Sequence, residues 1–344
     1  MFEFLILVLF CFVFSYSHSM AASQPGLLIV YSGPTSTSCS GRHAVYHSNF
    51  LRFLQIGLPR PQHHTGVLIV LVLTPGVKKF YGSLLDQVIA MYANCPTVQV
   101  RILLRENGDC YDMGAHMLAL TSLGIKHENP VNTHYTRFSH YVFINCGLLG
   151  PFVRRQRQTT TGKRGQKSDH DYWPHALTRH ITESVKLVGI SLNCDGKFAH
   201  KQAHIQSMLW ATDSVGIAVI LATDALHHCN ADASGGVARD RLINQYELGL
   251  SRAVMQANYS IRAPLHPLQS ALTYSSVNAT QRPFHPHCRD FWGTRERYLE
   301  TSVDPHDVLL WKNTRKRSRQ RPLPALSRAI SEALPAASEW NVAT

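Results

Sequence analysis

Four apolar runs in the first half of the chain predict β-strands that are buried on both faces. Val, Ile, Leu and aromatic residues follow one another in these runs with few polar residues between them, and Gly or polar residues follow each run. Short continuous runs of this kind are typical of parallel strands that helices cover on both sides. The four runs are residues 26–33, 65–73, 98–104 and 140–146.

The segments between these runs have the apolar spacing of helices. Residues 47–58, 80–95 and 114–125 repeat hydrophobic positions at the i, i+3, i+4 spacing that places them on one helix face. Strands that alternate with helices predict an α/β fold. We therefore expect a Rossmann-like, mostly parallel sheet flanked by helices, in a single large domain.

The second half of the chain has less regular patterns, and its elements are predicted one by one. Residues 260–301 contain several prolines and are expected to form loops. The expected elements are helices at 173–185 and 243–259, a long helix or a helix-turn at 204–226, and strands at 186–194 and 307–312.

The distribution of charge sets the expected limits of the domain. The net charge is +12, with 34 Lys and Arg residues against 22 Asp and Glu. Much of the positive charge lies in residues 154–171, expected to be a surface insertion, and in residues 316–344, expected to be a disordered tail. The folded domain is therefore predicted to span residues 26–315. A basic balance favours polyanionic partners such as phosphate-bearing molecules, nucleic acids, or anionic glycans and membranes.

The N-terminus predicts entry into the secretory pathway. Its apolar run from Phe4 to Phe14 is shorter than a membrane span and matches the core of a signal peptide. Residues 1–22 are expected to be a signal peptide or a short signal-anchor that could associate with the membrane. Most of the eight cysteines lie beyond this segment, so roughly one to three disulfides with at least one free thiol are expected. Glycosylation sequons at Asn258 and Asn278 fit the same compartment. We expect a Golgi or ER lumen location, or secretion.

Common catalytic motifs are missing, which narrows the function. The sequence has no GxGxxG after the first strand, no Walker A loop, no GxSxG and no HExxH. Polar residues instead follow several predicted strands, and the carboxyl ends of parallel strands meet at the edge of the sheet where ligands bind. Arg can neutralise a diphosphate, and Asp or Asn can bind a sugar hydroxyl, so a nucleotide-sugar site is indicated. The donor-binding candidates at this edge are Tyr31, Ser32, Arg105, Asn107, Asp112 and Asn145.

Several short motifs follow one another in a specific order from Arg105 to Arg315. They are RENGDCYDMG, FINCGLLGPF, VKLVGISLNC, HIQSM, YELGLSRAV and DPHDVLLWKNTR. No single motif is decisive, but their order and spacing resemble a family of glycosyltransferases similar to the rhamnan-synthesis-F-type proteins of polysaccharide assembly. The resemblance extends from about Leu27 to Arg315.

This resemblance implies a GT-A-like domain that binds a nucleotide-diphospho-sugar. In many GT-A enzymes an Asp-x-Asp motif closes the fourth strand and holds a divalent metal, and the corresponding residues here are Asn145, Cys146 and Gly147. A Mn²⁺ or Mg²⁺ cofactor therefore stays an open question, and no residue is assigned as a metal ligand. A metal-free site would need fixed cations to neutralise the leaving diphosphate. The cation candidates are Arg105, Arg252, Lys312 and Arg315.

Sugar transfer also needs a base that takes the proton of the acceptor hydroxyl. Glu247 and Asp213 are the candidates, although Glu247 could be a solvated carboxylate and Asp213 a helix cap. The HIQSM motif adds His204 and Gln206 as donor-binding candidates, and His204 could equally begin a helix. Asp112 could bind the ribose of the nucleotide or cap the helix that follows it.

The predicted function is that of a hexosyl- or deoxyhexosyltransferase that uses a nucleotide-sugar donor and a glycan or glycoconjugate acceptor. The alternative is a non-catalytic relative of the same fold that binds nucleotide-sugars or glycans. Nucleic-acid binding through the basic tail is disfavoured, because aromatic residues are not interleaved with the tail's charges and the N-terminus predicts a secretory protein.

Overall fold

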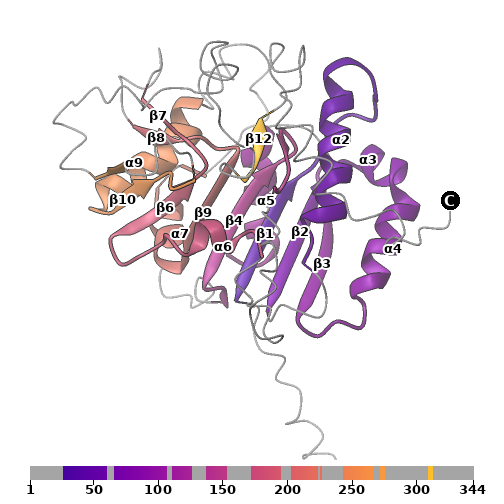
Figure 1. Cartoon of the computed structure of the whole chain (residues 1–344), viewed down its shortest axis with the longest axis horizontal. Helices are drawn as coiled ribbons and strands as arrows, with labels where there is room; N and C mark the ends of the chain where they lie inside the picture. Colours follow the sequence, from indigo (N-terminus) through magenta and orange to yellow (C-terminus); the bar gives the residue numbers. More distant parts are fainter. Residues whose placement is uncertain are drawn as a thin grey trace, which may run out of the picture.

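The computed structural model describes residues 26–59, 66–106, 111–125, 137–152, 172–194, 203–223, 225–226, 243–265, 272–275 and 309–312. These residues form one large sheet with the strand order β11-β10-β6-β9-β4-β1-β2-β3, together with two small two-stranded sheets. Figure 1 shows the large sheet crossing the molecule, with helices on both of its faces.

The four strands predicted from the apolar runs form the parallel half of the large sheet. They are β1 (Leu27–Ser32), β2 (Val67–Leu73), β3 (Val98–Leu104) and β4 (His140–Asn145). β1 pairs in parallel with both β2 and β4, and β2 pairs in parallel with β3. Every residue of β1 and β2 is buried, which explains why their sequences lack polar alternation. In β3, at the edge of the sheet, Gln99 and Arg101 are exposed.

The other half of the sheet contains both strand directions. It consists of β6 (Val185–Gly189), β9 (Leu209–Asp213), β10 (Ser260–Arg262) and β11 (Thr273–Tyr274). β9 runs antiparallel to β4 and β6, β10 runs parallel to β6, and β11 runs antiparallel to β10. The sheet is therefore mostly parallel and flanked by helices, which confirms the predicted α/β class.

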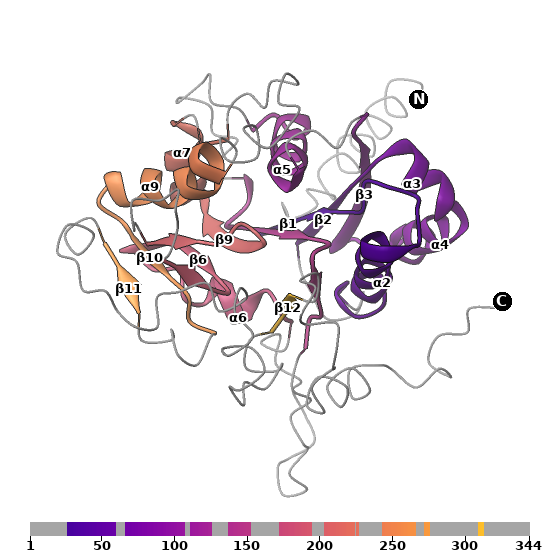
Figure 2. The same ribbon diagram turned by 90° about the horizontal axis from the view of Figure 1, so that it is seen from above.

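Helices cover the two faces of the sheet in separate layers, which Figure 2 shows from above. One face packs on the helices α2 (Gly41–Ile56), α3 (Pro75–Phe80), α4 (Gly82–Tyr92) and α6 (His175–Thr178). The other face packs on α5 (Tyr111–Ser122), α7 (Ser214–Leu221) and α9 (Leu248–Gln256). Successive residues of one strand serve different layers: Ile29 packs in the first core and Leu28 in the second. Full burial of each such aliphatic side chain stabilises the fold by about 1.5–3 kcal/mol.

The prediction of a long helix at 204–226 was wrong for its first half. This part contains β8 (His204–Ile205) and β9, and only then does α7 begin. Leu209 contacts one core and Trp210 the other, so β9 is apolar on both faces. A strand of this kind has the same continuous hydrophobicity as a buried helix.

Other predicted elements are present with different limits. The helix expected at 173–185 is the short α6, and the strand expected at 186–194 divides into β6 and β7 (Leu192–Asn193). The helix expected at 80–95 divides at Tyr81 into α3 and α4. The helix expected at 243–259 begins with a π-turn, η3 (Ile243–Glu247), before α9. The stretch 260–301, expected to form loops, contains β10 and β11.

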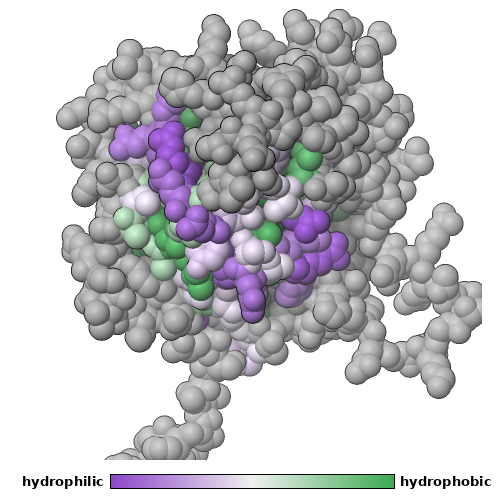
Figure 3. Space-filling model, turned by 90° about the vertical axis from the view of Figure 1, so that its left-hand side faces the viewer, coloured by the Kyte–Doolittle hydropathy of each residue, from purple (hydrophilic) through white to green (hydrophobic). Residues whose placement is uncertain are grey.

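Two short strand pairs complete the described structure. β12 (Trp311–Lys312) pairs antiparallel with β5 (Leu148–Leu149), which confirms a strand at 307–312 but outside the large sheet. β7 pairs antiparallel with β8. In Figure 3, which looks onto the side of the molecule with α9 and β10, hydrophilic residues form a band and apolar residues appear only in small patches.

Several predictions concern residues outside the described ones: the leader 1–22, the insertion 154–171 and the tail 316–344. Within the described ranges, no helix has the length and apolar content needed to cross a bilayer. Cys194 is disulfide-bonded, which confirms the expected use of disulfides, while Cys39, Cys95 and Cys146 are free thiols.

Candidate functional site

The carboxyl ends of the parallel strands meet at one edge of the sheet, as the sequence predicted. Ser32, the last residue of β1, is in register with Val72 on one side and with Asn145 on the other. The backbone N–H of Arg105, directly after β3, donates to the carbonyl of Leu73 at 2.9 Å. We call this row of strand ends, which is distinct from the edge strands β3 and β11, the carboxyl edge.

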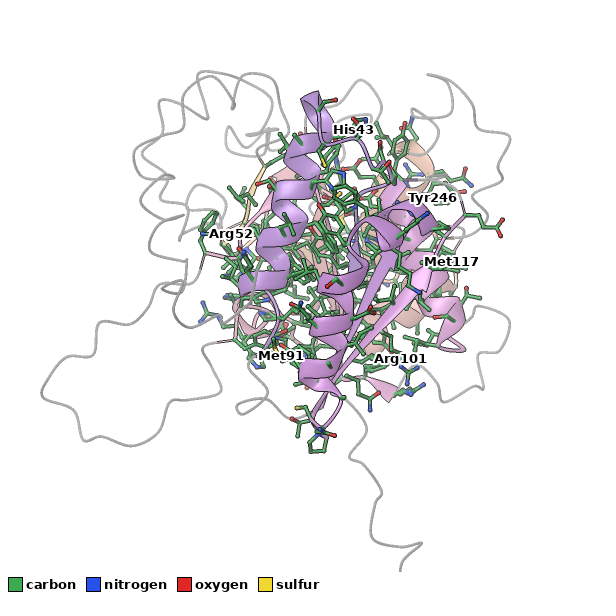
Figure 4. All side chains as sticks on the ribbon, turned by 90° about the vertical axis from the view of Figure 1, so that its right-hand side faces the viewer. His43, Arg52, Met91, Arg101, Met117 and Tyr246 are labelled. Carbon is green, nitrogen blue, oxygen red and sulfur yellow. The ribbon has the colours of Figure 1, made fainter. Side chains whose placement is uncertain are left out.

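Figure 4 shows the carboxyl edge at the top of the view, where the labelled His43 near the start of α2 lies at the same end of the molecule as Tyr246 of η3. Met91, near the end of α4, lies at the opposite end. The turn η3 therefore lies at the same end of the molecule as the start of the helix that follows β1.

Four polar residues from different elements meet at the carboxyl edge. Asn145 Nδ2 at the end of β4 donates to Asp112 Oδ2 of α5 at 2.8 Å. Ser207 Oγ, in the turn before β9, lies 3.3 Å from the same Asp112 oxygen and donates to it. The backbone N–H of Ser207 donates to Glu247 Oε1 of η3 at 3.2 Å. Asp112, Asn145, Ser207 and Glu247 are called the polar cluster below.

The Asn145 side chain uses both ends of its amide inside the protein. Its Oδ1 accepts from the backbone N–H of Gly147 at 2.9 Å, while its Nδ2 donates to Asp112. An ionised Asp at this position could not donate to Asp112 and would place a second carboxylate against it. The geometry of the cluster thus explains why an amide closes the fourth strand.

Arg105 holds the start of α5 close to the cluster. Its side chain is buried, and its Nη1 donates to the carbonyl of Tyr111, the residue before Asp112. Desolvation raises the pKa of the neighbouring Cys146 thiol to about 12, and the charge of Arg105 opposes this rise only in part. Cys146 is therefore a thiol at neutral pH, and the positive charge of Arg105 lies close to the end of β4.

Hydrogen bonds to surrounding residues hold β8 and the turn that follows it, and this turn places Ser207 at the cluster. The N–H of Ile205 donates to Ser251 Oγ of α9 at 2.9 Å. Gln206 Oε1 accepts from Ser191 Oγ at 2.6 Å. The carbonyl of Met208 accepts from the N–H of Asn145 at 3.0 Å, so the loop is tied to β4 as well.

His204 and Gln206 lie next to the cluster in the chain, but they are buried in the segment that positions Ser207. His204 lies in β8 opposite Asn193 of β7, and both His204 and Gln206 are buried. Their predicted contact with the donor stays a prediction. Ser207, which the sequence interpretation did not select, is the residue of the HIQSM motif that contacts the two carboxylates.

Asp213 lies at the opposite ends of the strands from Asn145, away from the carboxyl edge. β9 runs antiparallel to β4, so Asp213 is in register with His140, at the other end of β4 and about 17 Å away at 3.3–3.4 Å per residue. Its Oδ1 accepts from Gly216 N at 2.8 Å and caps α7, and its Oδ2 lies 2.5 Å from Lys186 Nζ. The structure therefore does not bring Asp213 together with Glu247, and it shows the helix cap considered as its alternative.

The remaining candidates fall in different environments. Tyr31 is fully buried and stacks on Phe53 with ring centroids 4.1 Å apart, so it belongs to the core below the carboxyl edge. Ser32 is buried at the end of β1. Arg252 is exposed on α9. Asn107 and Arg315 lie outside the described residues.

The last described strand pairs Lys312 with the short strand that follows β4. In the β5–β12 pair, Lys312 is in register with Leu148, the residue that follows Gly147. The backbone of Lys312 thus lies beside the segment that follows Asn145, although the two residues are far apart in the sequence.

The polar cluster does not fit a divalent cation in its present arrangement. Mg²⁺ and Mn²⁺ need several oxygen ligands, whereas Asp112 Oδ2 and Asn145 Oδ1 already accept hydrogen bonds from the protein. Within the described part of the chain, no group of three or more His, Cys, Asp or Glu side chains could hold a metal ion.

Comparison with known proteins yields distant structural similarity only. No family model matches the sequence, and no curated protein matches it. The structure is similar to that of 4-diphosphocytidyl-2C-methyl-D-erythritol synthase from Anaerococcus prevotii, with 10% identity and a TM-score of 0.30 over 65% of this chain and 84% of the other. It is also similar to apo mouse xyloside xylosyltransferase 1, with 7% identity and a TM-score of 0.35 over 83% of this chain and 93% of the other. At these TM-scores neither similarity carries the assignment of a function.

Proposed function

We propose that this chain is a glycosyltransferase that moves a hexosyl or deoxyhexosyl group from a nucleotide-diphospho-sugar to a glycan or glycoconjugate. The observation that carries the proposal is the polar cluster, in which two carboxylates and an amide meet at the carboxyl edge of a mostly parallel sheet. This edge is where open α/β sheets bind ligands. The resemblance of the sequence to rhamnan-synthesis-F-type proteins supports the same class.

The cluster offers groups that can bind the donor and groups that can deprotonate the acceptor. Asp112 can accept hydrogen bonds from hydroxyl groups of the donor. Glu247 is a carboxylate that can take the proton of the acceptor hydroxyl as the sugar is transferred. Arg105 and Lys312, beside the ends of β3 and β4, can neutralise the charge that develops on the leaving diphosphate.

A non-catalytic protein that binds nucleotide-sugars is the second candidate. The observation that favours it is Asn145, whose amide makes hydrogen bonds with Asp112 and Gly147 at the position where many GT-A enzymes hold a metal. Such a protein would keep the donor site without turning the donor over.

The experiment that separates the two candidates measures binding and turnover on the same preparation. The purified full chain is titrated with nucleoside diphosphates and nucleotide-sugars, and release of the nucleoside diphosphate is followed with and without glycan acceptors. Glu247→Gln keeps an oxygen that can accept from Ser207 N–H, so we expect unchanged donor affinity and turnover lower by about 10²–10⁴. Binding without turnover would favour the second candidate, and the lack of any nucleotide binding would overturn both.

We also propose that the protein works in the lumen of the secretory pathway. The apolar N-terminal run and the disulfide at Cys194 support this location, because structural disulfides persist in oxidising compartments. Immunofluorescence of the full chain, compared with a chain that lacks residues 1–22, tests it: cytosolic staining of the full chain would contradict the proposal.

A further inference from the structure

Two exposed apolar side chains border Arg105 at the carboxyl edge. Leu104, which precedes Arg105 in the chain, is 44% exposed, and Tyr111, whose carbonyl accepts from the Arg105 side chain, is 59% exposed. The other large hydrophobic residues with exposed side chains in the described part of the chain belong to α3, α4 and α7. Both side chains are therefore accessible to a ligand that binds at the carboxyl edge.

Tyr111 also has an unusual backbone. Its φ is 51°, in the left-handed region that a residue with a Cβ rarely adopts, and the hydrogen bond from Arg105 to its carbonyl holds it there. Glycine would adopt this conformation more easily. The ring lies largely in solvent, so packing in the core does not account for a tyrosine at this position. Strained residues of this kind are enriched at ligand sites.

We propose that the Tyr111 ring is the platform on which the base of the nucleotide donor stacks, with Leu104 as a neighbouring apolar contact. This inference rests on the proposed function. A nucleoside diphosphate combines a flat base, a ribose and two phosphates. Tyr111 supplies a ring for the base, Asp112 a carboxylate for hydroxyl groups and Arg105 a cation for the phosphates.

The ring is assigned to the base rather than to the sugar for a chemical reason. A base has two apolar faces, and stacking on an aromatic side chain is favourable for every base. A sugar carries hydroxyl groups that need hydrogen-bond partners, which the polar cluster provides.

The test compares nucleotide binding with binding of the diphosphate alone. The full chain and its Tyr111→Gly and Tyr111→Phe variants are titrated calorimetrically with ADP, CDP, GDP, UDP and pyrophosphate. We expect Tyr111→Gly to weaken the preferred nucleoside diphosphate by roughly five- to 150-fold, the range that corresponds to loss of one base stack. Pyrophosphate affinity should not change, and Tyr111→Phe should bind like the unchanged chain.

Two controls separate loss of the ring from damage to the fold. Tyr111→Gly should not lower the melting temperature, because glycine suits the observed φ. Phe80→Ala removes an exposed aromatic ring on α3, on the other face of the sheet, and should leave nucleotide affinity unchanged.

The outcomes distinguish this inference from the function on which it rests. If a nucleoside diphosphate binds the unchanged chain and Tyr111→Gly binds it equally well, the inference fails while the proposed function stands. Equal weakening of pyrophosphate would also overturn it, since the ring would then act on the phosphate site. If no nucleoside diphosphate binds the unchanged chain, both fail.

Discussion

At the scale of single residues, the neutral amide of Asn145 keeps a second negative charge away from Asp112. Its Nδ2 donates to Asp112 at 2.8 Å, so Asn145→Asp would replace an attractive contact by two carboxylates at hydrogen-bond distance. Like charges this close cannot both ionise without cost, and a divalent cation between them relieves the repulsion.

We predict that Asn145→Asp loses about 1–3 kcal/mol of stability at neutral pH and regains part of it when Mn²⁺ or Mg²⁺ is added. Urea unfolding with EDTA or with either cation measures this. Asn145→Ala, which has no charge, should be destabilised but insensitive to cations. An equal response of the unchanged chain to Mn²⁺ would show that the cluster already binds a metal.

The buried side chain of His116 makes the free energy of unfolding depend on pH. It lies one turn after Asp112 in α5, fully buried, with its ring centroid 5.0 Å from that of Phe143 and 6.0 Å from that of Trp210. Burial lowers the pKa of His116 from 6.5 to about 4, and the charge of Asp112 opposes this shift only in part.

Between pH 6.5 and 4 the unfolded chain therefore takes up a proton at His116 that the folded chain does not. The folded state loses stability as pH falls through this window, at up to about 1.4 kcal/mol per pH unit. We predict that His116→Phe flattens this dependence in urea unfolding measured from pH 6.5 to 4.5. Burial also lowers the pKa of His140 and His180. The measurement is therefore the difference in unfolding free energy between the unchanged chain and His116→Phe at each pH. A difference that does not change with pH would contradict the assignment.

At the scale of elements, the antiparallel direction of β9 determines which residues reach the site. A parallel strand brings its last residue to the carboxyl edge, whereas β9 brings the residues before it, including Ser207, and sends its last residue, Asp213, to the other edge. The sequence interpretation took residues after each strand as candidates. The residues selected in this way, Ser32, Arg105 and Asn145, do lie at the carboxyl edge. Asp213 was selected within a stretch that was predicted to be helical, and it lies at the other ends of the strands.

Ser207 was missed because the sequence around it was predicted to be helical, so neither β9 nor the turn before it was recognised. The runs that became β1 to β4 were predictable because continuous Val, Ile and Leu segments of that length suit few structures other than doubly covered strands. β9 has the same burial but lies directly before α7, so the two merged into one apparent helix. A Ser in a short turn between two buried strands carries no periodic signal of its own.

The position of Asp213 gives a prediction at this scale. It caps α7 and pairs with Lys186, and both side chains are largely buried. Asp213→Ala removes the cap and leaves the Lys186 ammonium without its carboxylate, so we expect a loss of about 2–4 kcal/mol. Asp213→Asn should keep the cap and lose less.

Thermal unfolding and nucleotide titration of both Asp213 variants provide the measurement. Donor affinity and turnover should be unchanged in folded protein, because Asp213 lies at the edge opposite the polar cluster. A variant that folds normally and yet loses turnover would restore Asp213 as a base candidate.

At the scale of the whole molecule, the C-terminal part of the described chain packs on the core and pairs with the segment that follows β4. Leu309 and Leu310 are buried in the first core, and the N–H of Phe152 donates to the carbonyl of Leu309 at 2.7 Å. β12 follows directly and places Lys312 opposite Leu148, beside the turn after β4. Packing and charge in this segment are therefore separable by mutation.

We predict that a chain ending at Arg315 keeps the melting temperature and nucleotide affinity of the full chain. A chain that ends at residue 308 loses two buried leucines and β12, which should cost about 2–5 kcal/mol for each leucine or prevent folding. Lys312→Ala in the full chain should lower the melting temperature far less than this truncation, because the buried leucines and the backbone pairing of β12 with β5 remain. Nucleoside diphosphate affinity should fall and become less dependent on salt, since an ion pair with the phosphates is lost. If Lys312→Ala binds nucleoside diphosphates as tightly as the unchanged chain, Lys312 does not contact the diphosphate, and Arg105 stays the cation candidate.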